Sequence, residues 1–191
     1  MSSHNSPAFA NIRYVFLDRD GVINRKLPEG EYVSNWDRIE ILPGAEEAIA
    51  KLNRSGRSVI VITNQRGIAL GHYTEADVKA MHDALQKHLA KTGAHIDAFY
   101  FCPHDRNECD CRKPKTGLFE QALRDFPGAS NKNSIVIGDS VSDIEAARNF
   151  GVPSIFIEGD PQFQKPGAEK ARSLADASSQ SLSEAVNRFL S

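Results

Sequence analysis

Two aspartates one residue apart follow a short apolar run near the start of the chain. Residues 14–17 are of the types that favour a buried strand, and Asp18, Asp20 and Gly21 come directly after them. The glycine lets the backbone turn there, so a carboxylate and a nearby carbonyl can share a divalent cation. A surface turn with two solvated acids is the alternative explanation of this stretch taken alone.

Three later stretches supply other groups that the cleavage of a phosphate monoester requires. Thr63 ends a second apolar run, Lys113 follows a cysteine-rich stretch, and Asp139 ends a further apolar run. Phosphoryl transfer needs a nucleophile, positive charge and a proton donor. We expect Asp18 to attack phosphorus and Asp20 to act as general acid and then as general base.

A magnesium ion is the predicted cofactor of this chemistry. Asp18, the main-chain carbonyl of Asp20 and Asp139 form an all-oxygen ligand set, which favours Mg²⁺. The hydroxyl of Thr63 is predicted to hold phosphate oxygens, and Lys113 is predicted to neutralise developing charge.

Four further polar residues are candidates for contacting the substrate or the catalytic groups. Asn64 and Gln65 are predicted to bind substrate, and Arg112 is predicted to bind a second anionic group. Asp143 is expected to orient Lys113 or a metal-bound water. The alternative for Asp143 is an acid in the first turn of a helix, where the helix dipole favours it.

A second set of residues has the composition of a zinc site. Cys102, His104, Cys109 and Cys111 offer three thiolates and an imidazole close together in the sequence. Such a set closes a tetrahedral site and leaves no position for water, so the predicted zinc ion is structural. A reduced surface loop with incidental cysteines is the alternative. Because the loop 102–111 leads directly to Lys113, folding it would position that cation.

Apolar runs and amphipathic stretches alternate along most of the chain, which predicts an α/β fold. We expect a Rossmann-like three-layer sandwich with a mostly parallel central sheet, and ligands bind such folds at the carboxyl ends of the strands. The strands are expected at 14–17, 58–63, 98–102, 134–138 and 154–157, and the helices at 44–53, 74–89, 118–126, 143–150 and 183–190.

The chain length of 191 residues favours one domain. We expect residues 1–11 to be a disordered lead and residues 12–191 to form a single phosphohydrolase domain that includes the zinc-binding loop. The intervals between the chemical motifs leave no room for a separate cap domain. The loops 19–38 and 66–73 and the zinc loop are therefore expected to form the rim that selects the substrate.

Overall charge and hydropathy limit the classes of partner that the protein is expected to bind. With 23 basic and 25 acidic residues, the chain offers no field that would gather nucleic acid, and no apolar run is long enough to cross a membrane. We expect a cytoplasmic monomer that acts on a small phosphorylated metabolite. The other histidines, His72, His82, His88 and His95, show no grouping and are expected to be surface or half-buried residues.

Four stretches, in this order, resemble the four motifs of the haloacid dehalogenase superfamily of phosphohydrolases. They are residues 18–22, 62–65, 113–114 and 138–143. The resemblance extends over about residues 14–157 and implies a magnesium-dependent phosphomonoester hydrolase that acts through an aspartyl-phosphate intermediate.

Within this superfamily, the zinc loop before Arg112 and Lys113 is similar to that of two enzyme groups, heptose-1,7-bisphosphate 7-phosphatases and histidinol-phosphate phosphatases. Residues 63–74 look more like the heptose group, whereas the short spacing between His104 and Cys109 looks more like the histidinol group. The prediction is removal of the 7-phosphate of D-glycero-D-manno-heptose 1,7-bisphosphate, with histidinol phosphate as the alternative substrate.

Receiver domains of signalling proteins also combine clustered acids, a threonine and a lysine around magnesium on an α/β sheet. They carry the phosphoaccepting aspartate on a later strand than the acid pair, whereas Asp18 and Asp20 follow the first strand of this chain. The order therefore favours a hydrolase. A mutase or phosphotransferase stays open, because a phosphoenzyme can pass its phosphoryl group to acceptors other than water.

Overall fold

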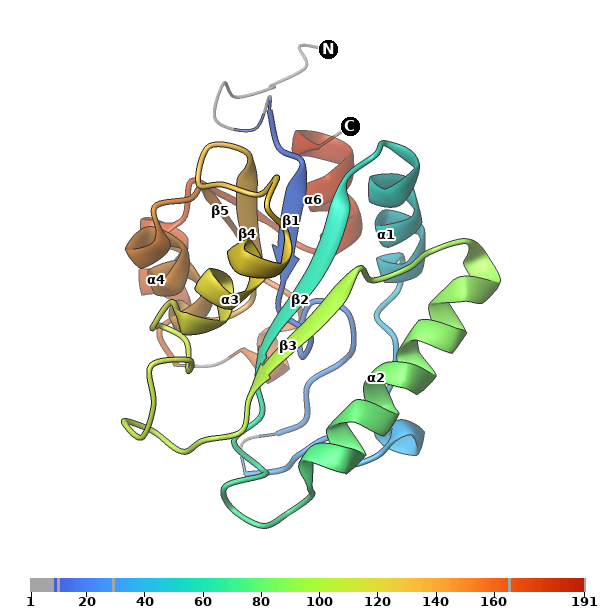
Figure 1. The fold of residues 1–191 in the computed structure, drawn as a ribbon, viewed down its shortest axis with the longest axis vertical. Coiled ribbons are helices and arrows are strands. Elements are labelled where there is room, and N and C mark those ends of the chain that lie inside the picture. Colours follow the sequence, from blue (N-terminus) through green and yellow to red (C-terminus); the bar gives the residue numbers. More distant parts are fainter. Residues whose placement is uncertain (1–8, 10, 29, 165, 191) are drawn as a thin grey trace.

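A parallel sheet of six strands forms the centre of the molecule (Figure 1). The computed structural model describes residues 9, 11–28, 30–164 and 166–190. Every pair of neighbouring strands is parallel, and the strand order is β3-β2-β1-β4-β5-β6. The strands are β1 (Tyr14–Leu17), β2 (Ser58–Asn64), β3 (Ala98–Cys102), β4 (Ser134–Gly138), β5 (Ser154–Ile157) and β6 (Ala177–Ser179).

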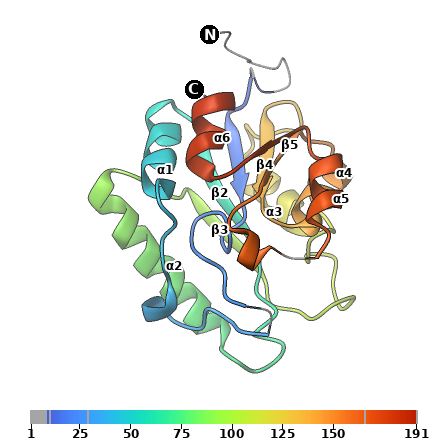
Figure 2. The same cartoon turned by 180° about the vertical axis from the view of Figure 1, so that it is seen from behind.

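Helices cover both faces of the sheet, as Figures 1 and 2 show from opposite sides. The predicted three-layer α/β sandwich is confirmed, and no inserted cap domain interrupts the described residues. One face packs against α1 (Ala45–Arg54), α2 (Glu75–Leu89) and α6 (Leu182–Phe189), and the other packs against α3 (Gly117–Asp125), α4 (Val141–Phe150) and α5 (Ala168–Leu174).

The strand order places β1 between β2 and β4, at the point where the order of the strands reverses. In the register of the sheet, Leu17 lies beside Val61 on one side and Ile137 on the other. The residues that follow these strands therefore meet at one edge, where doubly wound folds bind their ligands. Receiver-type sheets follow the order 2-1-3-4-5, which differs from the order observed here.

The predicted elements agree closely with the observed ones, but one α-helix and one strand were missed. Helix α5 and strand β6 lie near the carboxyl end, where short polar segments give no clear periodicity. At α2, Thr74 and Asp77 form a capping box. At α6, the Ser181 hydroxyl accepts from the N–H of Glu184, but the Glu184 carboxylate accepts from the N–H of Gln180, so only half of a capping box forms.

The predicted disordered lead, residues 1–11, lies mostly outside the described residues. Phe9 differs from that expectation, because it is buried and its ring centroid lies 5.3 Å from that of Phe189 on α6. His82 also differs from the expectation of a surface or half-buried residue, since it is buried on α2. No helix among the described residues is long and apolar enough to span a bilayer.

Candidate active site

A lysine and two aspartates form a buried ion network at the carboxyl edge of the sheet. The ammonium of Lys113 lies 3.0 Å from Asp18 Oδ1 and 2.6 Å from Asp143 Oδ1. It also donates to the carbonyl of Ile62 at 2.6 Å. Burial alone would lower the pKa of Lys113, but the charges of Asp143 and Asp18 outweigh it and raise this pKa above its usual value. Lys113 is therefore a permanent cation beside Asp18.

Asp143 makes the contacts that both interpretations of the sequence require, one with Lys113 and one with the start of a helix. One carboxylate oxygen pairs with Lys113, and the other accepts from the N–H of Ser140 at 3.0 Å and from its hydroxyl at 2.6 Å. Ser140 and Asp143 thus form a capping box at the start of α4. The helix terminus fixes Asp143, and Asp143 orients the lysine.

Three carboxylates converge where a magnesium ion is predicted. Oxygen atoms of Asp18, Asp139 and Asp143 lie within 4.8 Å of one another. The loop after Asp20 passes so close that a Cβ atom on Gly21 would lie 2.1 Å from Asp139 Oδ2, and Gly21 has a φ of +96°. Only glycine allows this approach. Hard oxygen donors in a tight cradle fit Mg²⁺.

The carboxylate of Asp20 lines the cavity and is held by several donors. Arg19 donates to both of its oxygens, at 2.9 to 3.2 Å, while Asn24 donates at 2.9 Å and Gln65 at 3.1 Å. Burial tends to raise the pKa of Asp20, but the Arg19 charge and these hydrogen bonds outweigh it and lower the pKa below its usual value. The structure thus favours the ionised form of this acid.

Asn64 and Gln65, both predicted to bind substrate, direct their side chains to other protein groups. The side chain of Asn64 exchanges two hydrogen bonds of 3.1 Å with the main chain of Lys113. Gln65 donates to Asp20 and, at 3.0 Å, to the hydroxyl of Thr63. Both amides therefore position catalytic candidates in this structure.

Tyr73 explains why the Gln65 amide has this orientation. Its hydroxyl donates to Gln65 Oε1 at 2.7 Å, so the amide nitrogen must face Asp20. Burial raises the pKa of Tyr73 to about 12, which keeps the donor protonated. A Cβ atom on Gly67 would lie 2.2 Å from the Tyr73 ring, so glycine is required where the loop crosses it.

Sequence reasoning missed three further polar residues of the site. Arg19 is fully buried, and Lys26 forms an ion pair with Asp139. His82 lies 3.4 Å from Arg19, and burial together with the Arg19 charge lowers its pKa to about 3. The position of His82 within the apolar face of α2 could have indicated from the sequence that it is buried. Nothing local in the sequence reveals the partner of Lys26.

A cavity of about 750 Å³ opens above these groups. Asp20, Lys113 and Arg112 are among the residues that line it. Arg112 and Arg106 form no ion pair within the described part of the chain, whereas Arg66 pairs with Asp105. The lining is strongly basic: Lys26, Arg66, Arg106, Arg112, Lys113 and Lys115 contribute to it.

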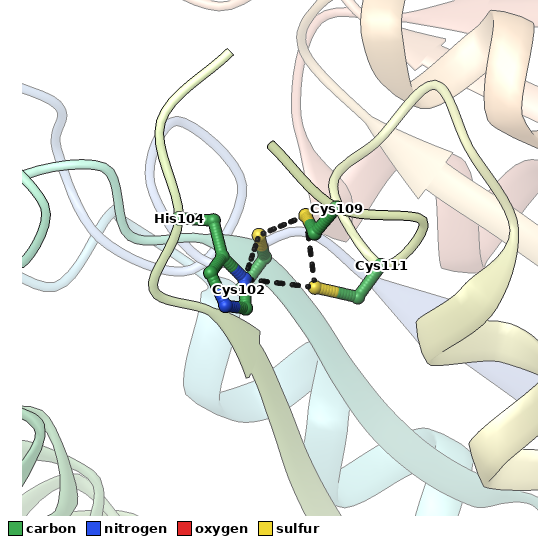
Figure 3. A group of neighbouring side chains, drawn as sticks. All are labelled: Cys102, His104, Cys109 and Cys111. Carbon is green, nitrogen blue, oxygen red and sulfur yellow. Dashed lines mark hydrogen bonds between the residues drawn. The ribbon is translucent and has the colours of Figure 1, made fainter. Parts of the chain in front are cut away.

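The four predicted zinc ligands meet in the loop after β3 (Figure 3). The sulfur atoms of Cys102 and Cys109 are 3.5 Å apart, those of Cys109 and Cys111 are 3.2 Å apart, and His104 Nδ1 lies 3.4 Å from Cys111 and 3.7 Å from Cys102. Tetrahedral zinc with bonds of about 2.3 Å separates its sulfurs by about 3.8 Å. The cluster fits zinc.

The three thiols of the cluster differ in protonation. Burial raises the pKa values of Cys102 and Cys111, which favours their neutral form without a metal. Burial raises the pKa of Cys109, but hydrogen bonds with Cys111 and Cys102 outweigh it and bring that pKa to about 7. Cys109 can thus release its proton near neutral pH, whereas the other two thiols would lose theirs only on binding a metal, as thiolate coordination requires. The main chain then runs directly into Arg112 and Lys113.

The chain belongs to the haloacid dehalogenase-like hydrolases, because the model of that family matches residues 6–151. This confirms the resemblance found in the sequence, and with it the predicted enzyme class, a phosphoric monoester hydrolase. Family membership and strand order both exclude the receiver-domain alternative.

Relatives of the chain are named phosphatases. The chain is 43% identical over 169 residues to the D-glycero-alpha-D-manno-heptose-1,7-bisphosphate 7-phosphatase of Mycobacterium bovis, covering 88% of this chain and 86% of that protein. It is 41% identical over 153 residues to the D-glycero-beta-D-manno-heptose-1,7-bisphosphate 7-phosphatase of Rhodopseudomonas palustris, covering 76% and 83% respectively.

A solved structure shares the fold over almost the whole chain. The D,D-heptose 1,7-bisphosphate phosphatase from B. bronchiseptica, crystallised with magnesium and phosphate, aligns with a TM-score of 0.81 and 29% identity. The alignment covers 94% of this chain and 98% of that one.

Proposed function

We propose that this enzyme removes the 7-phosphate of D-glycero-D-manno-heptose 1,7-bisphosphate. The observation that carries the proposal is the basic cavity above Asp20 and Lys113, whose wall holds further cations for a second phosphate. Two relatives with more than 40% identity are named for this substrate, one for each anomer. Comparing kcat/KM for the two anomers would show which of them this enzyme prefers.

The first half of the reaction transfers the phosphoryl group to the enzyme. A carboxylate oxygen of Asp18 attacks phosphorus, and the bond between phosphorus and the sugar oxygen breaks. Asp20 gives its proton to the departing oxygen. Asp20 is ionised in the ligand-free site, and the negative charge of an arriving phosphate favours the protonated form that this step uses.

The second half returns the enzyme to its starting state. Asp20 takes a proton from water as the water attacks the aspartyl-phosphate, and inorganic phosphate leaves Asp18. Lys113 and the hydroxyl of Thr63 stabilise the phosphoryl oxygens in both halves.

Mg²⁺ is assigned to Asp18, the Asp20 carbonyl and Asp139, where it would offset the repulsion between carboxylate and phosphate. Asp143 is proposed to act from outside the ligand set, since one of its oxygens pairs with Lys113 and the other accepts hydrogen bonds from Ser140. Zn²⁺ is assigned to Cys102, His104, Cys109 and Cys111 as a structural ion that holds the loop before Lys113.

We further propose that residues 12–191 act as one catalytic domain, as a cytoplasmic monomer without a nucleic-acid or membrane partner. The near balance of 23 basic and 25 acidic residues supports the part of this proposal that concerns nucleic acid.

The decisive experiment compares phosphate release from three substrates with Mg²⁺ present. The kcat/KM values for the two anomeric heptose 1,7-bisphosphates and for histidinol phosphate are measured under the same conditions. We expect one heptose anomer to be preferred by at least about tenfold. A preference for histidinol phosphate would contradict the proposed substrate and support the alternative predicted from the short zinc loop.

Arg112 provides a test of how the second phosphate is bound. Its guanidinium is well suited to a phosphate, so Arg112→Ala should lower kcat/KM for the bisphosphate by about 10- to 100-fold and much less for a simple monophosphate. Arg124→Ala, an exposed arginine on α3, is the matched control. Equal losses on both substrates would remove Arg112 from substrate selection.

A further inference from the structure

Arg19 lies at the centre of a buried hydrogen-bonded chain that the proposed reaction does not yet use. It has no exposed surface, although arginine is among the residues least often buried. Its Nε and Nη2 atoms donate to the Asp20 carboxylate at 2.9 to 3.2 Å. A paired, planar contact of this kind fixes the direction of a carboxylate as well as its place.

The other end of the guanidinium meets α2. Arg19 Nη1 lies 3.4 Å from Nε2 of His82. Arginine can only donate, so His82 must offer a lone pair at Nε2 and carry its proton at Nδ1. The low pKa of His82 agrees with a neutral imidazole. The imidazole ring stacks on Phe99, with ring centroids 4.4 Å apart, which fixes its plane.

His82 lies on the apolar face of α2, where burying its imidazole carries a desolvation cost. The other buried residues of α2 are Val78, Met81, Leu85 and Leu89, all apolar. An apolar side chain at position 82 would complete this face at no desolvation cost, whereas a buried imidazole must find a partner. Its partner is Arg19, and the partner of Arg19 is Asp20.

We propose that His82 and Arg19 are positioning residues that hold the Asp20 carboxyl group where it can protonate the leaving oxygen. The inference rests on the proposed role of Asp20 as general acid. Neither residue needs to touch the substrate. A purely structural role would instead stabilise the fold without any preference among substrates.

The test uses leaving groups that need the proton to different degrees. Departure of 4-nitrophenolate needs little protonation, whereas a sugar alkoxide needs it strongly. For His82→Leu we expect kcat/KM to fall about tenfold on the heptose bisphosphate and no more than about twofold on 4-nitrophenyl phosphate. His82→Gln, whose amide oxygen can accept from Arg19, should recover most of the loss.

Two further variants separate this inference from the proposed function. Asp20→Asn should lose about 10²- to 10⁴-fold on the sugar phosphate and far less on the aryl phosphate. If that selectivity is absent, Asp20 is not the general acid and the proposed mechanism fails. If Asp20→Asn is selective but His82→Leu loses equally on both substrates, only the positioning chain is overturned.

Leu85→Val, on the same buried face of α2, controls for simple loosening of the helix and should leave the ratio of the two kcat/KM values unchanged. If His82→Leu does not fold, Arg19→Lys asks the same question. Lysine keeps the charge but lacks the planar fork that makes the paired contact with the Asp20 carboxylate, so the same selective loss is expected. An equal loss on both substrates would again overturn the inference.

Discussion

The strand-end site and the zinc loop are assembled in opposite ways. At the strand ends, Asp18, Lys113 and Asp139 come from distant parts of the sequence, and each is less than about a tenth exposed. The zinc ligands lie close together in the sequence, and Cys109 and Cys111 are half-buried. The first region is organised by the sheet and by ion pairs, whereas the second is proposed to depend on a bound zinc ion. The two regions should therefore fail under different treatments.

The largest effect is expected at the nucleophile. Asp18→Asn removes the attacking carboxylate but keeps the size of the side chain, so turnover should fall by at least about 10⁴-fold while the melting temperature stays within a few degrees. Hydrolysis of 4-nitrophenyl phosphate and thermal unfolding followed by circular dichroism measure the two quantities. Residual activity near that of the wild type would show that another group attacks phosphorus.

Loss of zinc should disturb stability more than chemistry. Cys111→Ser removes one proposed zinc ligand. If zinc is lost, the melting temperature should fall by about 10 °C. Turnover should fall less, because the loop would then position Arg112 and Lys113 less well. Metal content by mass spectrometry and thermal unfolding check this. Arg106→Ala, in the same loop but outside the ligand set, should keep its zinc. An unchanged melting temperature in a zinc-free Cys111→Ser would contradict a structural role.

Acid should lower the free energy of unfolding of the protein through the protonation of His82. Its pKa is about 3 in the folded protein and about 6.5 when unfolded, so the unfolded state binds more protons between these values and stability falls as pH falls. Between pH 7.5 and pH 5 the free energy of unfolding should fall by about 2 kcal/mol, because burial and the Arg19 charge keep the imidazole of the folded protein neutral.

Urea unfolding at several pH values measures this contribution. His82→Gln should flatten the dependence of unfolding free energy on pH over this range, whereas His95→Gln, an exposed histidine, should leave it unchanged. An equal slope in wild type and His82→Gln would mean that other groups cause the acid sensitivity.

The smallest effect is expected at Lys26, whose ammonium pairs with Asp139. A cation beside a metal ligand competes with Mg²⁺ for the carboxylate, so Lys26→Met should tighten Mg²⁺ binding by roughly three- to tenfold. Isothermal titration calorimetry of Mg²⁺ into the protein measures this directly, with the exposed Lys132→Met as control. Weaker binding would instead mean that Lys26 holds Asp139 in its metal-binding orientation.

The strands were predictable from sequence because buried parallel strands are continuous apolar runs, and those at β3, β4 and β5 were placed at their observed bounds. The acids that end β1 and β4 were found by the same logic, since parallel strands end at one edge. The candidate zinc ligands could be predicted from residue type and close spacing alone. These features depend on short stretches of chain.

Tertiary structure alone decided which donor meets which acceptor. The Asn64 amide faces the Lys113 main chain, Lys26 reaches Asp139, and Arg19 joins Asp20 to His82. Each contact joins side chains whose directions are fixed by packing of separate elements, and hydrogen bonds depend on distance and angle within a few tenths of an ångström. Residue types and spacing along the chain carry no such information, so the sequence determined the chemistry available and the fold determined its arrangement.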